Sequence, residues 1–183
     1  MMKSKLTPLG ADYFHRDCLE LAPDLVGKLI VRRIGNEELV LRITETEAYR
    51  GEEDTACHAS KGRTPRTELL YREAGTIYVY LCYGMHWLFN IISGEEGQPQ
   101  GVLIRACENY EGPARLTKYL KIDKALNGSS VIGNSEISIA DDGFRPEIEQ
   151  RRRVGIDYAD EKDRNALWRF ADKRTKEVLR AKK

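Results

Sequence analysis

The sequence predicts an α+β fold built as a single compact domain over residues 1–183. Short runs of alternating apolar and polar residues, separated by tight turn signals, are typical of antiparallel strands. Helical patterns stand near both ends of the chain, and no linker or internal repeat divides its 183 residues. We therefore expect a curved antiparallel sheet, open and barrel-like, that is flanked by helices and carries one protruding β-hairpin.

The N-terminal part of the chain predicts a helix followed by a long hairpin. Asp17 and Glu20 have the spacing of a capping box that opens a short helix, which Pro23 is expected to kink. Strands are expected over residues 29–34 and 39–49, because the Gly-Asn pair between them suits a tight hairpin turn.

The remaining elements follow from similar signals. Residues 50–74 are polar and contain glycine and proline, so they are expected to form a loop with a helical turn. Pro113 stands at the first position of a basic amphipathic helix that is expected to end near Ile122. A last helix is expected in the basic tail, residues 172–183. Further strands are expected over residues 76–82, 87–93, 102–107, 137–140 and 153–156.

Composition limits the class of protein. Hydrophobic residues make up 41% and charged residues 32% of the chain, so a packed core is expected and global disorder is excluded. Thirty basic residues against 29 acidic ones give a net charge of +1, which excludes a histone-like polycation. The four cysteines form no C-x-x-C pair and no apolar run could span a bilayer, so we expect a reduced cytoplasmic protein that does not bind membranes.

Basic residues are concentrated in four segments. Residues 61–72, 113–124, 145–153 and 172–183 together carry +12, which leaves −11 on the rest of the chain. This segregation suits a protein with one face that binds a polyanion. Ordinary solvated helix faces and a soluble tail would give the same pattern and are favoured by composition alone, so both interpretations stay open.

Two glutamates fall at unexpected positions in the strand predicted over residues 39–49. Side chains alternate along a strand, so Glu45 and Glu47 share a face with Leu39, Leu41 and Ile43. That face is expected to look inward, which puts both carboxylates against the core or at the edge of a pocket. A buried carboxylate is costly unless it is paired or takes part in chemistry. The alternative is that the strand has left the core and both glutamates are solvated.

Tyrosines mark two candidate positions for contact with a flat ligand. Tyr78 and Tyr80 share one face of their strand, where they would stack a planar ligand in a pocket or simply favour strand formation. Tyr83 precedes Gly84 at a predicted hairpin tip. An exposed ring at that position suits either a wedge between bases or a cap on the hairpin.

The histidines carry no metal signature. Cys57 and His58 are adjacent, and no second pair of ligands has the spacing of a zinc site, so neither a metal nor another cofactor is expected. His58 follows the acidic residues 52–54 in a polar loop. It is either a residue that contacts a ligand or an ordinary loop histidine.

An ordered series of motifs extends from about Leu9 to Phe170. Its members are Thr44-Glu-Thr-Glu-Ala-Tyr49, Gly51-Glu-Glu-Asp54, Ala56-Cys-His-Ala-Ser60, Thr64-Pro-Arg66, Gly75-Thr-Ile-Tyr-Val-Tyr80, Tyr83-Gly-Met85, Asn90-Ile91, Val102-Leu-Ile-Arg105-Ala106 and Gly112-Pro-Ala-Arg-Leu-Thr117. In this succession the chain resembles the alkyladenine (3-methyladenine) DNA glycosylases of the single-domain type. It departs from them at Cys57 and His86 and is weakly matched over residues 127–150.

The resemblance implies hydrolysis of the N-glycosidic bond of a damaged purine in duplex DNA, with an abasic site as the product. At the matching positions, Glu47 corresponds to the general base that activates water, and Arg105 to a residue that helps to hold that water. A main-chain carbonyl near residues 154–156 is implied as a further ligand of the water. The resemblance also implies pocket walls at Tyr49, His58 and Tyr80, exclusion of the guanine amino group by Asn90 and Leu103, and insertion of Tyr83 into the duplex.

The resemblance implies partners as well. Double-stranded DNA with a damaged purine is the expected substrate of a monomeric enzyme, associated with the nucleoid when bound, and abasic-site repair enzymes are expected to act downstream. The basic segments supply the candidate phosphate contacts, which are Arg63, Arg66, Arg115, Lys118, Arg151, Arg152 and Arg153. Two other classes stay open: a non-catalytic nucleic-acid-binding module that stacks bases on tyrosines, and a metal-dependent hydrolase that uses His58 and the acids at 52–54.

Overall fold

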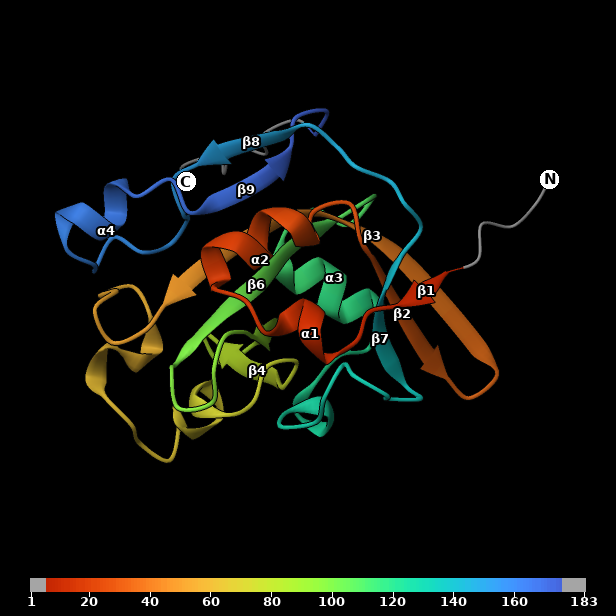
Figure 1. The fold of residues 1–183 in the computed structure, drawn as a ribbon, viewed down its shortest axis with the longest axis horizontal. Coiled ribbons are helices and arrows are strands. Elements are labelled where there is room, and N and C mark those ends of the chain that lie inside the picture. The colour runs from red at the N-terminus through yellow and green to blue at the C-terminus, as the bar shows by residue number, and fades with distance from the viewer. Residues whose placement is uncertain (1–5, 176–183) are drawn as a thin grey trace.

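Strands dominate the computed structural model, which describes residues 6–175. Within those residues, seven strands form an open antiparallel path (Figure 1). Two more strands lie outside this path: β9 (Arg169–Asp172) pairs with β3, and β8 (Ile148–Arg151) pairs with β9. The order along the path is β1 (Thr7–Pro8), β7 (Ile137–Asp141), β2 (Leu29–Ile34), β3 (Glu37–Arg50), β6 (Gln100–Cys107), β5 (His86–Ile92) and β4 (Ile77–Cys82).

Two helices cover the apolar core of the sheet. α2 (Cys18–Leu25) and α3 (Pro113–Tyr119) both contribute leucines to the same buried cluster. The predicted α+β class is therefore confirmed, with a sheet that is open rather than closed. The other helical segments are short: α1 (Ala11–Phe14), α4 (Glu161–Asn165) and the 3-10 helices η1 (His58–Lys61), η2 (Glu68–Tyr71) and η3 (Lys124–Leu126). Among residues 6–175, no helix has the length and apolar character needed to cross a bilayer.

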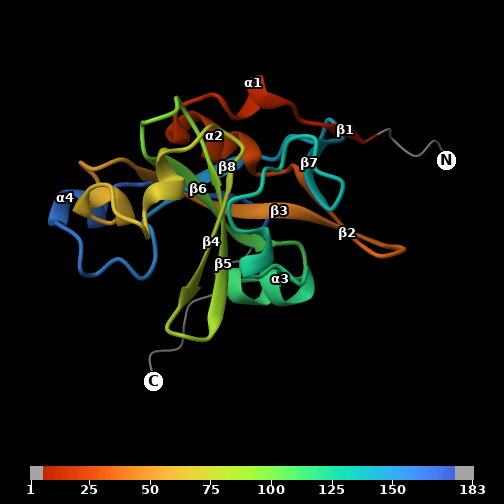
Figure 2. The ribbon, with the colours of Figure 1, turned by 90° about the horizontal axis from the view of Figure 1, so that it is seen from below.

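Local sequence signals explain the best-predicted elements. The Asp17 carboxylate caps α2 by accepting the N–H of Leu19 at 2.9 Å, which satisfies one free donor of the first turn. The β2–β3 hairpin turns at Gly35, whose φ of +59° favours glycine. The β4–β5 hairpin extends away from the body of the protein (Figure 2), as expected for the protruding hairpin.

Three predicted segments in the second half of the chain differ from the structure. Residues 153–156 form a loop, because Gly155 adopts a φ of +76° that an extended strand does not accommodate. Residues 173–175 follow β9 as a turn, so no helix starts at residue 172, and the rest of that predicted helix lies outside the described residues. α3 stops at Tyr119, before the predicted end, because Lys121 adopts a φ of +49°.

Candidate active site

A paired irregularity in β3 and β6 turns the site residues toward a cavity. Between Ile43 and Thr46 the pairing with β6 shifts by one residue and then returns, so each strand carries one additional residue at this step. Bulges of this kind re-aim side chains and increase the local twist. Thr44 and Glu45 consequently both line the cavity, although they are neighbours in the chain.

Because of this irregularity, the two glutamates lie on a different face of β3 from the one predicted. The apolar side chains of residues 39–43 lie in the core as expected, but beyond the bulge Ala48 joins that core and Thr46 donates its hydroxyl hydrogen to α2. Glu45 and Glu47 face the opposite side, where the cavity lies. The predicted shared face is wrong, and the expected position at a pocket arises from the bulge instead.

Glu47 is completely shielded from solvent, yet its carboxylate has partners on both oxygens. The Tyr49 hydroxyl donates to Oε2 at 2.7 Å, and the Val154 N–H donates to Oε1 at 2.9 Å. The Nε of Arg105 lies 3.5 Å from Oε1. Hydrogen bonds and a nearby cation make such a buried carboxylate tolerable.

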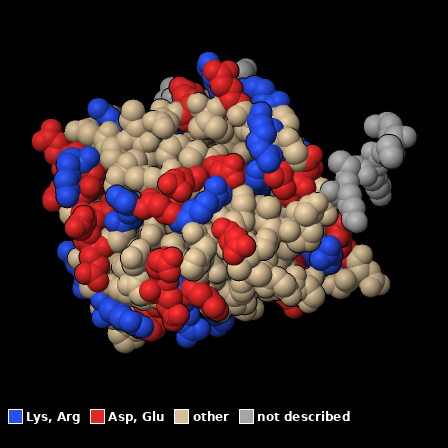
Figure 3. Space-filling view, viewed as in Figure 1, with Lys and Arg blue, Asp and Glu red and all other residues tan. Residues whose placement is uncertain are grey.

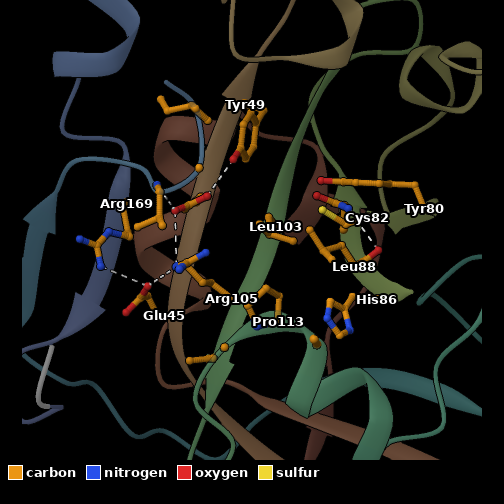
Figure 4. Close-up of a pocket in the computed structure, with 18 of the residues that line it drawn as sticks. Glu45, Tyr49, Tyr80, Cys82, His86, Leu88, Leu103, Arg105, Pro113 and Arg169 are labelled. Carbon is orange, nitrogen blue, oxygen red and sulfur yellow. Dashed lines mark hydrogen bonds and ion pairs between the residues drawn. The ribbon is translucent and has the colours of Figure 1, made fainter. Parts of the chain in front are cut away.

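Arg105 lies between the two glutamates and is closer to Glu45. Its Nε is 2.7 Å from Oε1 of Glu45, and the same oxygen is 3.4 Å from Nη1 of Arg169 (Figure 4). Arg169 lines the cavity because β9 pairs with β3 and sets this residue opposite Glu47. Arg169 is not among the residues predicted for the site, since the short Arg-Phe-Ala-Asp segment has no strand signal of its own.

Aromatic side chains form one wall of the cavity. The ring centroids of His58 and Tyr80 lie 4.6 Å apart, and those of Tyr78 and Tyr80 lie 5.4 Å apart. His58 Nδ1 is hydrogen-bonded to the Tyr78 hydroxyl at 2.9 Å. Burial, with a smaller effect of Arg66, lowers the pKa of His58, so its imidazole is neutral at pH 7. Burial also raises the pKa of Tyr80, which keeps that hydroxyl protonated.

The cavity has a volume of about 1060 Å³, and strands β5 and β6 provide part of its lining. Asn90 and Leu103 lie opposite each other across these strands, and both are buried. The Asn90 amide donates to the carbonyl of Tyr78 at 3.1 Å, which fixes the orientation of its side chain. Figure 4 shows Leu103, Leu88 and Tyr80 converging on the cavity from neighbouring strands.

Tyr83 stands at the tip of the β4–β5 hairpin, beyond the last pair, Cys82 and His86. Its side chain is 79% exposed and its φ is +51°, an uncommon value for a tyrosine. Met85 on the same tip is also exposed. A solvated apolar tip beside a cavity mouth is the geometry expected of a wedge.

The candidate phosphate contacts differ in their surroundings. Arg63 pairs with Glu68 at 2.7 Å, and the largely buried Arg151 pairs with Glu149 at 2.6 Å. On the face of the described residues seen in Figure 3, acidic and basic side chains are interspersed, so the charge segregation along the chain does not produce a uniform surface there. The other exposed candidates are Arg66, Arg115, Lys118 and Arg152, of which Arg66 and Arg115 line the cavity.

Arg153 is not placed to contact phosphates, because it is buried in an ion pair. Its two terminal nitrogens donate to the carboxylate of Asp54 at 2.6 and 2.9 Å. The guanidinium carbon lies 4.8 Å from the ring centroid of Tyr49 and 4.9 Å from that of Trp168. Arg153 thus anchors the loop from which Val154 donates to Glu47. The Val154 N–H is thus the main-chain group of this loop that meets the carboxylate, and a carbonyl of residues 154–156 as a ligand of the water stays a prediction.

The residues considered for a metal-dependent hydrolase have other partners. His58 is bonded to Tyr78, and both oxygens of Asp54 are engaged by Arg153. Across residues 6–175, no three His, Cys, Asp or Glu side chains gather in a way that could hold a metal ion.

The sequence of this chain matches one known protein family and is similar to proteins of several organisms. A sequence model of the family described as methylpurine-DNA glycosylase matches residues 12–176. A protein of Natranaerobius thermophilus is 40% identical over 88% of this chain and 93% of its own length, and one of Borreliella burgdorferi is 42% identical over 92% and 97%. A third, of Methanocella arvoryzae, is 40% identical over 90% and 92%. All three carry the provisional name 3-methyladenine DNA glycosylase.

Proposed function

Because this chain belongs to the methylpurine-DNA glycosylase family, we propose that it excises alkylated purines such as 3-methyladenine from duplex DNA by hydrolysis, and so leaves an abasic site. The observation that carries the proposal is the buried carboxylate of Glu47, which faces a cavity walled by tyrosines and a neutral histidine. A carboxylate at this position of the cavity would repel phosphate groups rather than bind them. It suits a reaction in which water must be activated beside a planar base.

The damaged nucleotide must first leave the base stack. Turning it out costs a few kcal/mol and is easiest for damaged or mispaired bases. Tyr83, at the exposed hairpin tip, occupies the gap, and the everted base enters the cavity beside Tyr49, Tyr80 and His58. A purine alkylated at N3 or N7 is cationic, so stacking on tyrosine gains about 0.5–2 kcal/mol over a neutral base. Asn90 and Leu103 face the base edge and disfavour the guanine amino group.

Glu47 acts as the general base in the chemical step. The oxygen of a water molecule attacks C1′, the bond from C1′ to the purine nitrogen breaks, and the water proton passes to Glu47. The bonding electron pair leaves with the purine, which neutralises an alkylated base, so no covalent intermediate is needed. Arg105 orients the water. A neutral lesion such as hypoxanthine also needs a proton on the leaving base, so we expect its removal to be slower.

Contacts to the DNA backbone come from exposed cations, of which Arg66 and Arg115 line the cavity. Arg66, Arg115, Lys118 and Arg152 have this exposure, and their contacts would be independent of sequence and sensitive to salt. We also propose that the protein acts as a monomer in the cytoplasm, bound to the nucleoid when engaged, and passes its abasic product to downstream repair enzymes.

The proposal is tested with duplexes that each carry one lesion: 3-methyladenine, 7-methylguanine, hypoxanthine or etheno-adenine. The expected result is alkali-labile abasic sites from at least one of them, with the single-turnover rate reduced by about 100-fold or more in Glu47→Gln. Removal of none would refute the proposal. A Glu47→Gln variant as fast as the wild type would instead favour a role for the cavity in binding alone.

A further inference from the structure

Glu45 and Glu47 compete for a single guanidinium. The Nε of Arg105 lies 2.7 Å from Oε1 of Glu45 but 3.5 Å from Oε1 of Glu47. Figure 4 shows Arg105 and Arg169 on either side of Glu45. Arg105 is thus closer to Glu45, whose carboxylate is partly exposed, than to Glu47, whose carboxylate is fully buried.

Hydrogen bonds use only some of the acceptor positions of Glu47. A carboxylate has about four lone-pair positions. Tyr49 uses one on Oε2, and Val154 uses one on Oε1. One position on each oxygen remains, which is the number that a bidentate arginine needs, and such pairing is frequent between arginine and a carboxylate. A guanidinium held elsewhere leaves these positions without an arginine partner, on a side chain that lines the cavity but is shielded from bulk solvent.

We propose that Glu45 is a positioning residue that holds Arg105 by its Nε, so that the guanidinium stays beside Glu47 without pairing bidentately with it. This role rests on the proposed function, because it matters only if Glu47 must accept a water proton. Arg169 supports the arrangement by sharing the oxygen of Glu45 that Arg105 uses. Two cations and two carboxylates then form one balanced group at the bulge of β3 and β6.

The test compares Glu45→Gln in two backgrounds, wild type and Arg105→Ala, by single-turnover release of base from a 7-methylguanine duplex. In the wild-type background we expect a rate about 10- to 100-fold lower, the size associated with losing one charge-assisted hydrogen bond. In the Arg105→Ala background the same substitution should change the rate by less than about 2-fold, because its target is gone. Affinity for the duplex should stay the same in both comparisons.

Glu38→Gln is the matched control, because it removes an exposed carboxylate paired with Arg33 at 2.8 Å and leaves the cavity untouched. Its rate should equal that of the wild type. If Glu45→Gln melts below the assay temperature, Glu45→Asp replaces it. That variant should lose about 3- to 10-fold in rate, and this loss too should vanish in the Arg105→Ala background.

A crystal structure of Glu45→Gln gives a readout that does not depend on activity. Arg105 is expected within hydrogen-bonding distance of Glu47, in place of the present 3.5 Å. An unmoved Arg105, an unchanged rate, or an equal loss in both backgrounds would overturn the positioning role. Failure of the proposed function looks different: the wild type and Glu47→Gln would release equal amounts of base, whatever stands at position 45.

Discussion

Tyr49 donates its hydroxyl hydrogen to Glu47, its neighbour two residues earlier on the same face of β3, over 2.7 Å. Burial, together with the adjacent negative charge of Glu47, raises the pKa of Tyr49 well above its ordinary value. The phenol therefore stays protonated, and remains a donor, at neutral pH. One residue thus combines a ring for the cavity wall with a fixed hydrogen bond to the carboxylate.

Replacing Tyr49 with phenylalanine separates these two roles. The ring remains, but Glu47 loses a hydrogen bond worth about 1.5–3 kcal/mol, so the single-turnover rate of base release should fall by about 10- to 100-fold. Base eversion, followed by 2-aminopurine fluorescence next to the lesion, should be unchanged. A fall in eversion with an unchanged chemical rate would contradict the separate roles.

His58 should make the protein less stable in mild acid. Burial, followed by the charge of Arg66, lowers its pKa from the ordinary 6.5, so below that pH the unfolded chain binds a proton that the folded protein does not. The free energy of unfolding in urea should therefore decrease as the pH falls from 7 to 5. Phe does not titrate, so His58→Phe should flatten this part of the curve. A slope identical to that of the wild type would show that His58 does not contribute.

The buried pair of Arg153 and Asp54 should be costly to break. Arg153→Met leaves the carboxylate of Asp54 buried without its cation, and the expected loss is about 3–5 kcal/mol in the free energy of unfolding. Arg33→Gln breaks an exposed pair and should cost less than about 1 kcal/mol. The double variant Arg153→Met with Asp54→Asn should recover part of the loss, which chemical denaturation would measure.

Salt dependence of DNA binding separates free cations from paired ones. Lys118 is exposed on α3, and Lys118→Ala should reduce the slope of log K against log salt by about 1 if it meets a phosphate. Arg63 is matched in charge but already paired with Glu68, so Arg63→Ala should reduce that slope by less. Fluorescence anisotropy of an undamaged duplex between low and physiological salt distinguishes the two variants. If both variants keep the slope of the wild type, the contact belongs to other residues.

Elements governed by local signals could be predicted from the sequence. The β2–β3 hairpin depends on its turn glycine, and α2 on its Asp17 cap, so their positions follow from a few neighbouring residues. β9 could not be recognised in this way, because its four residues acquire strand geometry only by pairing with β3, more than 120 positions away. Arg169 was missed together with it.

The cavity residues also divide into those that local sequence signals place and those that depend on distant contacts. Tyr80 and Tyr83 fall where strand alternation and the hairpin turn place them. The bulge at Thr44 has no counterpart in the alternation of apolar residues, so the inward face was assigned incorrectly beyond it. Arg153 follows two other arginines, and nothing in its neighbours distinguishes the one that Asp54 buries from the two that remain nearer the surface.

The irregularities in β3 and β6 compensate each other, and this restricts how the gene can vary. From Ile43 to Thr46 and from Cys107 to Ile104 the two strands advance by equal numbers of residues, so the ladders on both sides remain aligned. Deletion of Thr44, the additional residue of β3, would restore plain alternation and keep Glu47 on the cavity side. Deletion of Thr46 would instead present Ala48 where Glu47 now stands. The gene can therefore lose a codon at the bulge more readily than in the ladder beyond it.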